Sequence, residues 1–501
     1  MANQNLYFHL REAFISSAGK TFLAGPGFDA LSYLACDELT GQLANLMADR
    51  GLTAGDRVLT RTDKSPMALM LYLACLRSGV IYVPVNPACT DDELDYFLAD
   101  ANPTLFIGDK EFCVRVSNSH GIQSLSLDQN GQGALVDAAQ ALPFDHDIAD
   151  SQADDVAVLI YTSGTTGTPK GAMLSHNNLL ANAQTLHTAW GWSSDDVLLH
   201  CLPIFHVHGL FVATHLAMLG ASTLLFLPRF DTDLVLQYFS DATVFMGVPT
   251  YYTRLLQVAR LDTASCQKFR LFVSGSAPLL TETFQVFRER TGHTILERYG
   301  MSETGMLVSN PLDGERLAGT VGYPLPGVET RIRDEAGNSV EQGDIGILQV
   351  KGANVFNGYW GKPELNHSEF QDSYFITGDM VQEAPDGRIT LVGRSKDLVI
   401  SGGLNIYPKE IESVLDQQPG ILESAVFGVP HPDFGEGLVA AVVPEEGADL
   451  NTDALLTACR EKLAAYKSPK SIILLNELPR NSMGKVQKNR LREQHAGLFQ
   501  T

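Results

Sequence analysis

The chain is short of positive charge. Its 501 residues include 36 lysines and arginines against 58 aspartates and glutamates, which gives a formal net charge of -22. Nucleic acids and anionic membranes bind positively charged surfaces, so this balance argues against broad binding to either. A small anionic substrate would need a local positive field that overrides the net charge. The length predicts more than one domain.

Paired cysteines are also missing. The seven cysteines are dispersed and form no C-x-x-C motif, which argues against a disulfide framework and against a zinc site. They are Cys36, Cys75, Cys89, Cys113, Cys201, Cys266 and Cys459. Residues 1–20 lack the long apolar core of a secretory signal, although a short targeting peptide stays open. We therefore expect reduced thiols and a cytoplasmic protein.

Long uninterrupted apolar runs are rare, and one segment needs testing as a membrane span. Residues 197–228 contain no Asp, Glu, Lys or Arg, and the segment is longer than a bilayer requires. It is nevertheless interrupted by four histidines, by Pro203 and by Gly209 and Gly220. A strand, a loop and a buried helix fit better than a membrane helix.

Short apolar runs alternate with helical stretches through most of the chain. Helices are expected at 36–51, 65–79 and 233–239, and strands at 56–59, 80–85, 156–160, 221–227, 244–248 and 271–273. This alternation predicts an α/β fold with doubly wound, mostly parallel sheets. Ligands bind at the carboxyl ends of the strands in such sheets, and polar motifs follow Ile160, Val273 and Leu296.

After Gly319 the pattern changes to short alternating strands separated by Gly and Pro turns. Strands are expected at 329–333, 346–350 and 388–392, which predicts an antiparallel, barrel-like subdomain. The polar stretch 393–397 is the best boundary. We therefore expect a large domain over residues 1–394 and a small α+β domain over residues 395–501.

Residues 161–171, Tyr-Thr-Ser-Gly-Thr-Thr-Gly-Thr-Pro-Lys-Gly, are rich in glycine and hydroxyl side chains. They lie between the apolar run 156–160 and a helical stretch that begins near Asn177. Glycines let backbone N–H groups converge on an anion, hydroxyls add donors and Lys170 adds a positive charge. The Walker A loop is excluded, because here a proline precedes Lys170 and a glycine follows it. Taken alone, the loop fits polyphosphate binding and a solvated connection equally well.

The full string resembles the phosphate loop of the adenylate-forming superfamily, which contains acyl-CoA synthetases, luciferases and peptide-synthetase adenylation domains. Further motifs of that superfamily follow in its order, namely Gly275–Pro278, Tyr299–Glu303, Tyr374–Asp379, Arg394 and Lys485. Each alone would pass for a turn, an edge strand or a surface ion pair. Their common order over most of the chain favours the resemblance, with Ser302 in place of the usual threonine.

The resemblance implies a nucleotide site for ATP. The phosphates would be bound by Thr162, Ser163, Gly164, Thr165, Thr166, Gly167, Lys170 and Ser302. Adenine and ribose would be bound by Gly275, Ser276, Ala277, Pro278, Arg298, Tyr299, Gly300, Met301, Asp379 and Arg394. Mg²⁺ would be held by Glu303 and Thr166 together with ATP oxygens, which form the hard ligand set that this ion prefers.

The resemblance also implies a catalytic set of Lys485, Glu303 and Lys396. Lys485 would bridge the attacking carboxylate and the α-phosphate, where a flexible ammonium stabilises a transition state crowded with anions. Thioester formation would then require the small, mobile domain to rotate about Lys396. That rotation would bring the CoA-binding residues Ser401, Gly402 and Gly403 to a tunnel for the thiol.

The implied acyl pocket holds two cations in an otherwise apolar setting. Its residues would be His206, Arg254, Ser276, Arg298 and Met306. Arg254 lies one helical turn beyond Thr250, so it could face the same cavity. Two arginines favour a substrate that carries a second carboxylate. Alternatively, Arg254 pairs with a structural acid at the surface.

Across nearly the whole chain the sequence looks most like the malonyl-CoA synthetases of this superfamily. This implies that malonate, ATP and CoA give malonyl-CoA, AMP and diphosphate through a malonyl-adenylate. Methylmalonate is a further candidate, because one methyl group is weakly discriminated. The alternatives are a short- or medium-chain acyl-CoA synthetase, an enzyme that loads a carrier protein, and a non-catalytic nucleotide-binding protein. We expect no nucleic-acid or membrane partner, and a monomer or weak homo-oligomer.

Overall fold

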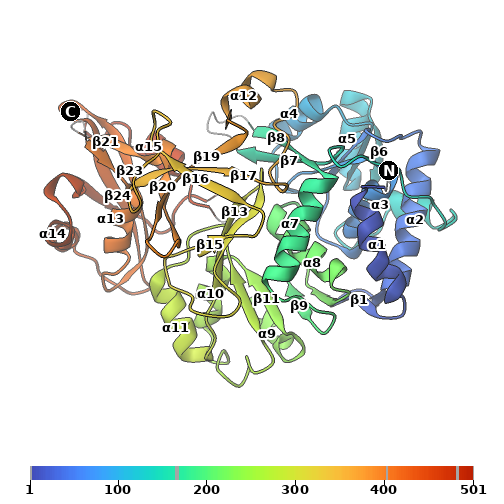
Figure 1. Cartoon of the computed structure of the whole chain (residues 1–501), viewed down its shortest axis with the longest axis horizontal. Helices are drawn as coiled ribbons and strands as arrows, with labels where there is room; N and C mark the ends of the chain where they lie inside the picture. The colour runs from blue at the N-terminus through green and yellow to red at the C-terminus, as the bar shows by residue number, and fades with distance from the viewer. Residues whose placement is uncertain (1–2, 164–168, 402–403, 481–484, 500–501) are drawn as a thin grey trace.

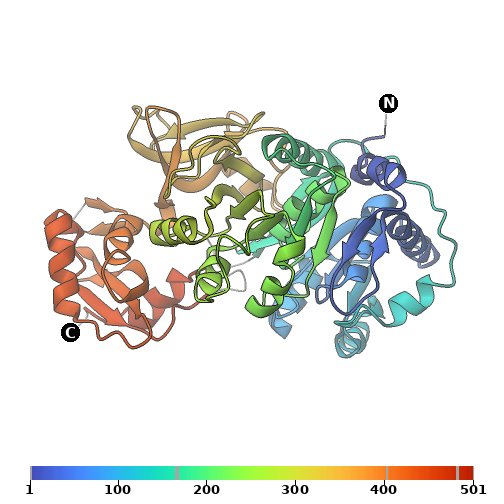
Figure 2. The same ribbon diagram turned by 90° about the horizontal axis from the view of Figure 1, so that it is seen from below.

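The computed structural model describes residues 3–163, 169–401, 404–480 and 485–499. A large part built from two α/β sheets and one antiparallel sheet contains the N-terminus, and a smaller α+β domain contains the C-terminus at the opposite end (Figure 1). Figure 2 shows the same separation from below. The predicted α/β class with a separate C-terminal domain is therefore confirmed.

The first α/β sheet has six strands in the order β6-β5-β3-β4-β7-β8, parallel except for the last pair. Its strands are β3 (Arg57–Arg61), β4 (Ile81–Pro84), β5 (Leu105–Gly108), β6 (Gln123–Ser126), β7 (Val156–Ser163) and β8 (Pro169–Ser175). Its helices are α2 (Tyr33–Asp49), α3 (Pro66–Ser78), α4 (Asp91–Ala101), α5 (Lys110–His120) and α6 (Ala134–Ala139). In α3, Ser65 caps the first turn and Gly79 ends the helix at φ 68°, which explains the accurate prediction of that helix.

The second α/β sheet has nine strands in the order β15-β14-β13-β12-β11-β9-β10-β1-β2 and is parallel from β13 to β1. Its strands are β1 (Thr21–Ala24), β2 (Leu31–Ser32), β9 (Val197–His200), β10 (Thr223–Phe226), β11 (Val244–Gly247), β12 (Leu271–Ser274), β13 (Leu296–Met301), β14 (Gly305–Ser309) and β15 (Tyr323–Pro324). The accompanying helices are α1 (Leu6–Ser16), α7 (His176–Ala189), the π-helix η1 (His208–Ala213), α8 (Thr214–Leu219), α9 (Thr232–Gln237), the 3₁₀ turn η2 (Phe239–Asp241), α10 (Pro249–Leu256) and α11 (Thr281–Thr291).

The region after residue 319 forms an antiparallel five-stranded sheet, as the alternating strands predict. The order is β16-β17-β19-β18, with β20 paired to β19. Its elements are β16 (Glu329–Arg333), β17 (Ile345–Lys351), α12 (Pro363–Ser368), β18 (Phe370–Gln371), β19 (Tyr374–Glu383) and β20 (Ile389–Arg394). The strand β20 ends at Arg394, beside the expected boundary.

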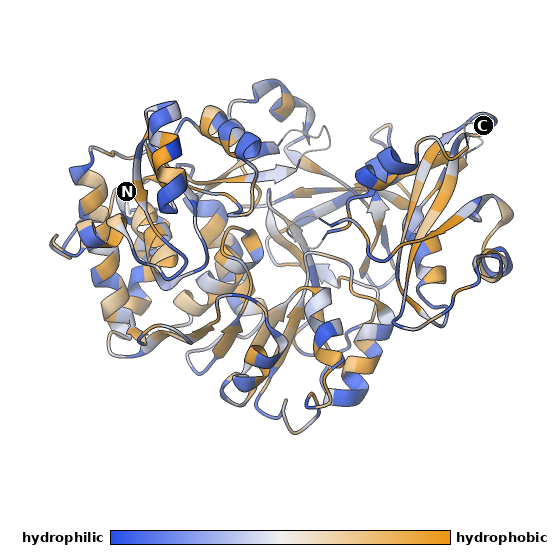
Figure 3. Cartoon of the chain, turned by 180° about the vertical axis from the view of Figure 1, so that it is seen from behind, coloured by the Kyte–Doolittle hydropathy of each residue, from blue (hydrophilic) through white to orange (hydrophobic). Residues whose placement is uncertain are grey.

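The C-terminal domain has its own sheet and its own apolar clusters. Its elements are η3 (Ser395–Asp397), β21 (Val399–Ser401), β22 (Leu404–Ile406), α13 (Pro408–Leu415), β23 (Ile421–His431), β24 (Gly435–Pro444), α14 (Thr452–Lys462), η4 (Ala465–Lys467), β25 (Ser471–Leu474) and α15 (Lys488–His495). Successive residues of β23 belong to different clusters: Val426 packs in one with Ile411, and Phe427 in the other with Leu491. Helices therefore cover both faces of this sheet, whose strands appear hydrophobic in Figure 3.

Two local expectations are wrong. The phosphate loop was expected between a strand and a helix, but the antiparallel strand β8 intervenes and pairs with β7 before α7 begins. The motif that begins at Tyr299 was expected to follow a strand end at Leu296, but β13 continues to Met301 and turns back into β14. Both motifs thus lie on hairpins, whose backbone hydrogen bonds hold residues without apolar alternation in extended conformation.

The uncharged segment 197–228 is folded into the second α/β sheet. It contains β9, the π-helix, α8 and β10, with His200, His208 and His215 buried. Among the residues that the structure describes, no helix is long and apolar enough to cross a membrane.

Candidate active site

Two hairpins meet at the centre of the candidate site. On the first, Thr162 of β7 pairs with Lys170 of β8. Lys170 is buried, its Nζ lies 3.3 Å from Glu369 Oε1 and 5.0 Å from the centre of the Tyr359 ring. The ion pair with Glu369 offsets the cost of burying the charge of Lys170. Gly164, Thr165, Thr166 and Gly167, all predicted to bind phosphate, lie outside the described residues, as does the side chain of Ser163.

On the second hairpin, Glu303 lies in the turn between β13 and β14 and is 5% exposed. Its Oε1 accepts hydrogen bonds from Thr162 Oγ1 at 3.2 Å and from the Tyr359 hydroxyl at 3.0 Å. Burial and the Glu303 charge raise the pKa of Tyr359, which keeps it a proton donor. The structure therefore brings together Thr162 and Glu303, two of the predicted residues, and adds Tyr359. Ser302 precedes Glu303 and is half-buried.

A carboxylate in this setting fits Mg²⁺. The hydrogen bonds from Thr162 and Tyr359 both use Glu303 Oε1, and among the described residues no group of three or more His, Cys, Asp or Glu side chains is arranged to hold a metal. A cation bound here would therefore take its other ligands from ATP phosphates and water, as Mg²⁺ commonly does.

A hydrogen-bonded chain crosses from β13 to the end of β20. The Tyr299 hydroxyl donates to Asp379 Oδ2 at 2.5 Å, and Arg394 Nε lies 3.0 Å from Asp379 Oδ1. Tyr299 and Asp379 are buried, whereas Arg394 is partly exposed. Three residues predicted to bind adenine and ribose thus form one network around a single carboxylate, which accepts hydrogen bonds and donates none.

The turn after β12 lies against Arg298. Ser276 has a positive φ of 72°, and its Oγ lies 3.4 Å from His208 Nδ1. A Cβ on Gly275 would stand 2.3 Å from Arg298 Cζ, so glycine is required for the guanidinium to pack there. Ala277 follows half-buried and Pro278 follows exposed.

Glycine is also required at position 300, where β13 and β14 approach closely. A Cβ on Gly300 would stand 2.1 Å from the carbonyl oxygen of Gly305. Met301, the next residue, is partly buried against the main core. The predicted glycine thus serves hairpin closure, which in turn places Glu303.

Arg298 is a buried cation with open hydrogen-bond donors. It is 3% exposed, and its Nε and Nη2 have no hydrogen-bond partner among the described residues. Burial lowers its pKa to about 9. A buried guanidinium with open donors is costly unless an anion is bound beside it. The site is therefore built for a negatively charged group.

The histidines of this region are neutral. Burial and the Arg298 charge hold the pKa of His208 well below its usual range. Burial and the Lys485 charge lower the pKa of His206 to about 3. Neither histidine therefore adds to the positive charge of Arg298 near neutral pH.

The two remaining residues predicted to bind the acyl group, Met306 and Arg254, differ in burial. Met306 is buried on β14, and Asn182 binds both its N–H and its carbonyl group. Arg254 is exposed on α10, and none of the ion pairs among the described residues includes it. The alternative of a pairing with a surface acid thus finds no partner among the described residues. Tyr252 and Leu255 of the same helix are buried, whereas Arg254 is open to solvent.

The C-terminal domain reaches the site through Lys485. The residue as a whole is exposed, but the protein surrounds its ammonium. Burial of the ammonium and the Arg394 charge lower the pKa of Lys485, whereas the Asp379 and Glu303 charges raise it. The electrostatic coupling places Lys485 at the same centre as Glu303 and Arg394. Of the residues predicted to bind CoA, Ser401 is buried on β21, and residues 402–403 lie outside the described part.

Lys396 lies at the junction between the two parts. It is exposed in η3, between Ser395, whose Oγ donates to the Gly378 carbonyl, and Asp397, which lies 2.8 Å from Arg492 of α15. The neighbours of Lys396 are thus anchored to different domains.

Several residues at this centre could not be found from sequence. Tyr359 and Glu369 precede β18, and Asn182 lies within α7. Their roles arise only from tertiary contacts, and no local motif marks them. The segment 354–360, with its asparagines and aromatics, was the one signal available, because polar residues among buried aromatics need hydrogen-bond partners.

Comparison with known proteins identifies the family. The model for the AMP-binding enzyme matches residues 11–360, and the model for the AMP-binding enzyme C-terminal domain matches residues 410–485. The chain belongs to the AMP-binding enzyme family. This AMP-binding enzyme is 38% identical to mouse mitochondrial malonate–CoA ligase ACSF3, over 83% of this chain and 78% of that one. It is 34% identical to a feruloyl-CoA synthase of an Amycolatopsis species, over 93% and 94%.

The solved structures are closer still. ATP-bound MatB from Rhodopseudomonas palustris is 47% identical and superposes with a TM-score of 0.97, over 99% of this chain and 100% of that one. Apo MatB, with the same identity and coverage, gives 0.85. The structure of this AMP-binding enzyme is therefore more similar to the ATP-bound form than to the apo form.

Proposed function

We propose that this protein is an AMP-forming malonate–CoA ligase. A carboxylate oxygen of malonate attacks the α-phosphorus of ATP, and diphosphate leaves. The sulfur of CoA then attacks the carbonyl carbon of the malonyl-adenylate, its thiol proton is lost and AMP leaves. The products are malonyl-CoA, AMP and diphosphate. The relatives named as malonate–CoA ligase, at 38% identity, and MatB, at 47%, support this choice.

Arg298 is the observation that carries the choice of acid. A monocarboxylate loses its charge to the adenylate, whereas malonate keeps a second carboxylate that needs a partner. The buried Nε and Nη2 of Arg298 offer two parallel donors for that carboxylate. A pocket for a fatty or aromatic acid would instead leave this cation uncompensated. We propose that Arg254, exposed on α10, meets the same carboxylate from the mouth of the pocket.

For adenylate formation we propose that residues of both hairpins hold the ATP phosphates. We assign this role to Thr162 and Lys170 of the first hairpin and Ser302 of the second, and the burial of Lys170 makes it a strong anion partner. When bound, Mg²⁺ at Glu303 neutralises phosphate charge. Tyr299, Asp379 and Arg394 receive the ribose, and the turn at Gly275–Pro278 receives adenine. Lys485 stabilises the charge that gathers between carboxylate and α-phosphate.

For thioester formation we propose a domain boundary between Arg394 and Ser395, with Lys396 as the hinge. The adenylate-forming arrangement places Lys485 at the site, where it would obstruct the approach of CoA. Rotation about Lys396 removes it and presents the β21–β22 hairpin with Ser401, Gly402 and Gly403. The anchoring of Ser395 and Asp397 to different domains supports this hinge.

A diphosphate-release assay over malonate, methylmalonate, succinate, acetate and octanoate, with and without CoA, tests this function. We expect malonate to have the highest kcat/KM, methylmalonate to be accepted, and steady turnover to require CoA. Preference for octanoate or acetate would instead identify a short- or medium-chain acyl-CoA synthetase. Steady turnover without CoA would contradict the ligase assignment.

The cysteines bear on the location of the enzyme in the cell. All seven cysteines are buried and unpaired, which supports a reducing, cytoplasmic location. We propose a monomer or weak homo-oligomer that uses Mg²⁺ and small-molecule substrates.

A further inference from the structure

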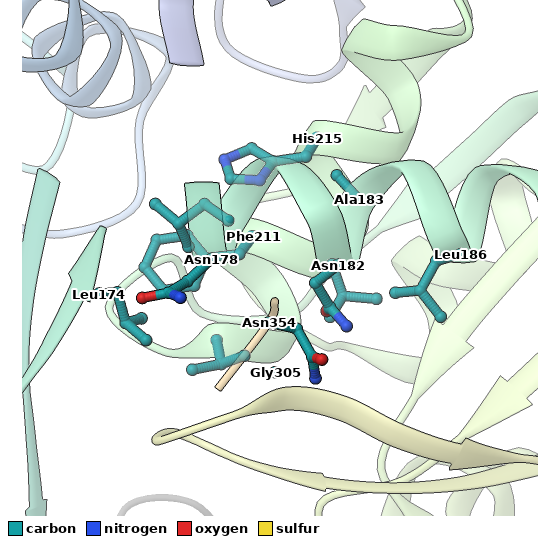
Figure 4. A pocket seen from close by; sticks show the side chains of 12 residues that line it. Leu174, Asn178, Asn182, Ala183, Leu186, Phe211, His215, Gly305 and Asn354 are labelled. Atoms are coloured by element: carbon teal, nitrogen blue, oxygen red, sulfur yellow. The ribbon is translucent and has the colours of Figure 1, made fainter. Parts of the chain in front are cut away.

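Three buried asparagines bind main-chain groups behind the β13–β14 hairpin. Asn178 and Asn182 lie on α7, and Asn354 lies in the loop after β17. Figure 4 shows these side chains around one cavity, together with Gly305 and His215. None of them carries a charge, so they can act only through hydrogen bonds and packing. Their partners decide what they do.

Asn182 makes a two-point contact with a single residue. Its Nδ2 donates to the carbonyl oxygen of Met306 at 2.9 Å, and its Oδ1 accepts the N–H of Met306 at 3.1 Å. These two groups point away from β13, although Met306 pairs with Gly300 of that strand. The next strand, β15, joins β14 at Val308 and Ser309. The amide of Asn182 therefore takes the place of a neighbouring strand at Met306.

The same peptide is held from a second side. Asn354 Nδ2 donates to the carbonyl of Thr304 at 2.7 Å and lies 3.4 Å from that of Met306. Gly305 adopts φ 61°, and a Cβ there would stand 2.5 Å from Asn182 Oδ1. A left-handed glycine at this position thus gives Asn182 access to the strand.

We propose that Asn182 is a positioning residue that fixes the depth of the acyl pocket by holding the main chain of Met306. This rests on the proposed function and on the prediction from sequence that Met306 lines the acyl pocket. Glu303, in the same hairpin, is held separately by Thr162 and Tyr359. Loss of Asn182 should therefore disturb the acid far more than ATP.

The test is Asn182→Leu, which keeps the size of the side chain and removes both hydrogen bonds. We expect the KM for malonate to rise about tenfold and the KM for ATP to change less than about twofold, because a small displacement at one substrate is costly. The kcat/KM ratio of methylmalonate to malonate should rise at least about threefold, because a looser pocket discriminates a methyl group less. Equal changes in both KM values, or an unchanged ratio, would overturn the proposal.

A second variant keeps the test decisive if Asn182→Leu does not fold. Asn182→Asp retains the acceptor for the Met306 N–H but places an oxygen against the Met306 carbonyl. Hydrogen exchange of residues 304–309 should be faster in this variant, together with the same KM split. Unchanged exchange and unchanged KM values would contradict the role of Asn182.

The matched control is Asn5→Leu. Asn5 is fully buried, and its Nδ2 donates to Leu76 O at 2.8 Å and to Ser151 Oγ at 3.0 Å, outside the candidate site. We expect it to lower the melting temperature without any KM split. If the wild type prefers an acid other than malonate, the proposed function fails, and the KM split measured on that acid still decides the role of Asn182.

Discussion

The buried charge of Arg298 destabilises the protein when it is unpaired and favours the binding of a carboxylate beside it. Its guanidinium packs against Gly275, and the nearby His208 is neutral because burial and Arg298 itself lower its pKa. Nothing among the described residues neutralises Arg298 at hydrogen-bond distance. Binding of a carboxylate therefore restores the missing partner, which makes this one side chain the main determinant of acid choice.

The first prediction concerns this charge. Arg298→Met keeps apolar volume and removes both donors. Leaving the second carboxylate of malonate unpaired should cost about 2–5 kcal/mol, or at least about 30-fold in kcat/KM. Activity with acetate should change little, because acetate has no second charge. Diphosphate release with the two acids measures the difference.

Arg290→Met is the matched control for Arg298. Arg290 Nε donates to Leu261 O at 2.7 Å and Nη2 to Val258 O at 2.6 Å, away from the pocket. It should lower stability and reduce activity equally with both acids. A uniform loss in Arg298→Met as well would assign Arg298 a structural role only.

The second prediction concerns the hydrogen bond of Tyr359. Tyr359→Phe removes the donor to Glu303 Oε1 at 3.0 Å in a residue that is 4% exposed. Partners that orient a metal-ligating carboxylate typically contribute about 10- to 100-fold to metal affinity. Half-saturation by Mg²⁺ in diphosphate release should therefore shift upward at least about tenfold. Tyr7→Phe, which removes a comparable bond to Asp37, should leave the Mg²⁺ requirement as it is.

At the scale of elements, the sequence predicted those whose signals are local. Ser65 and Gly79 mark the ends of α3, and the alternation in residues 329–333 matches β16. The strand β8 was missed, because proline, lysine and glycine at its start show no strand pattern and its extended form depends on pairing with β7. Family motifs placed Glu303, Tyr299 and Asp379 where the structure brings them together.

The remaining site residues depend on packing that no local pattern encodes. Helical spacing predicts Arg254 beside the pocket, and the structure leaves it exposed while Tyr252 and Leu255 of the same helix are buried. Tyr359 contacts Glu303 across 56 residues of sequence, and Asn182 contacts Met306 across 124. Such contacts follow from how the two hairpins and α7 are assembled, not from propensity or spacing.

The third prediction concerns two glycines, Gly275 in the turn after β12 and Gly300 near the end of β13. In Gly275→Ala the new Cβ meets the movable end of Arg298, so the protein should fold and the guanidinium should shift. We expect a higher KM for malonate with a melting temperature close to wild type. In Gly300→Ala the Cβ meets the backbone carbonyl of Gly305, which cannot yield so easily. That variant should lose stability by about 1–3 kcal/mol. Similar melting temperatures for both variants would contradict this distinction.

The fourth prediction concerns the whole molecule and acid. Burial lowers the pKa of seven histidines below the usual value near 6.5. It falls to about 4 for His176 and about 3 for His206 and His215, lies well below the usual range for His200 and His208, and is also lowered for His187 and His293. The unfolded chain binds these protons at a higher pH than the folded chain does. Stability should therefore be complete above pH 6.5 and fall progressively toward pH 3, by about 1.4 kcal/mol per pH unit for each proton taken up.

Three carboxyl groups oppose this trend. Burial raises the pKa of Glu297 to about 7 and of Asp416 to about 6, and it also raises that of Glu423, so they favour the folded state as the pH falls. With seven histidines against three carboxyls, the net effect is destabilising. Urea unfolding between pH 7 and pH 4.5 measures it. Replacing His215 by Gln should reduce the slope, and an unchanged slope would show that His215 titrates normally in the fold.

The last prediction concerns the movement of one domain against the other. Ser395 is tied to Gly378 of the large domain at 3.1 Å, and Asp397 to Arg492 of the small domain at 2.8 Å. A rotation that keeps both anchors must be absorbed by the backbone of Lys396 between them. Lys396→Pro fixes φ near -65°, so it should leave malonyl-adenylate formation largely intact and slow thioester formation. Lys396→Ala removes the side chain but keeps the backbone free, so both steps should stay near wild type. Single-turnover assays of diphosphate release and of malonyl-CoA formation separate the two steps, and equal loss of both in the proline variant would place the hinge elsewhere.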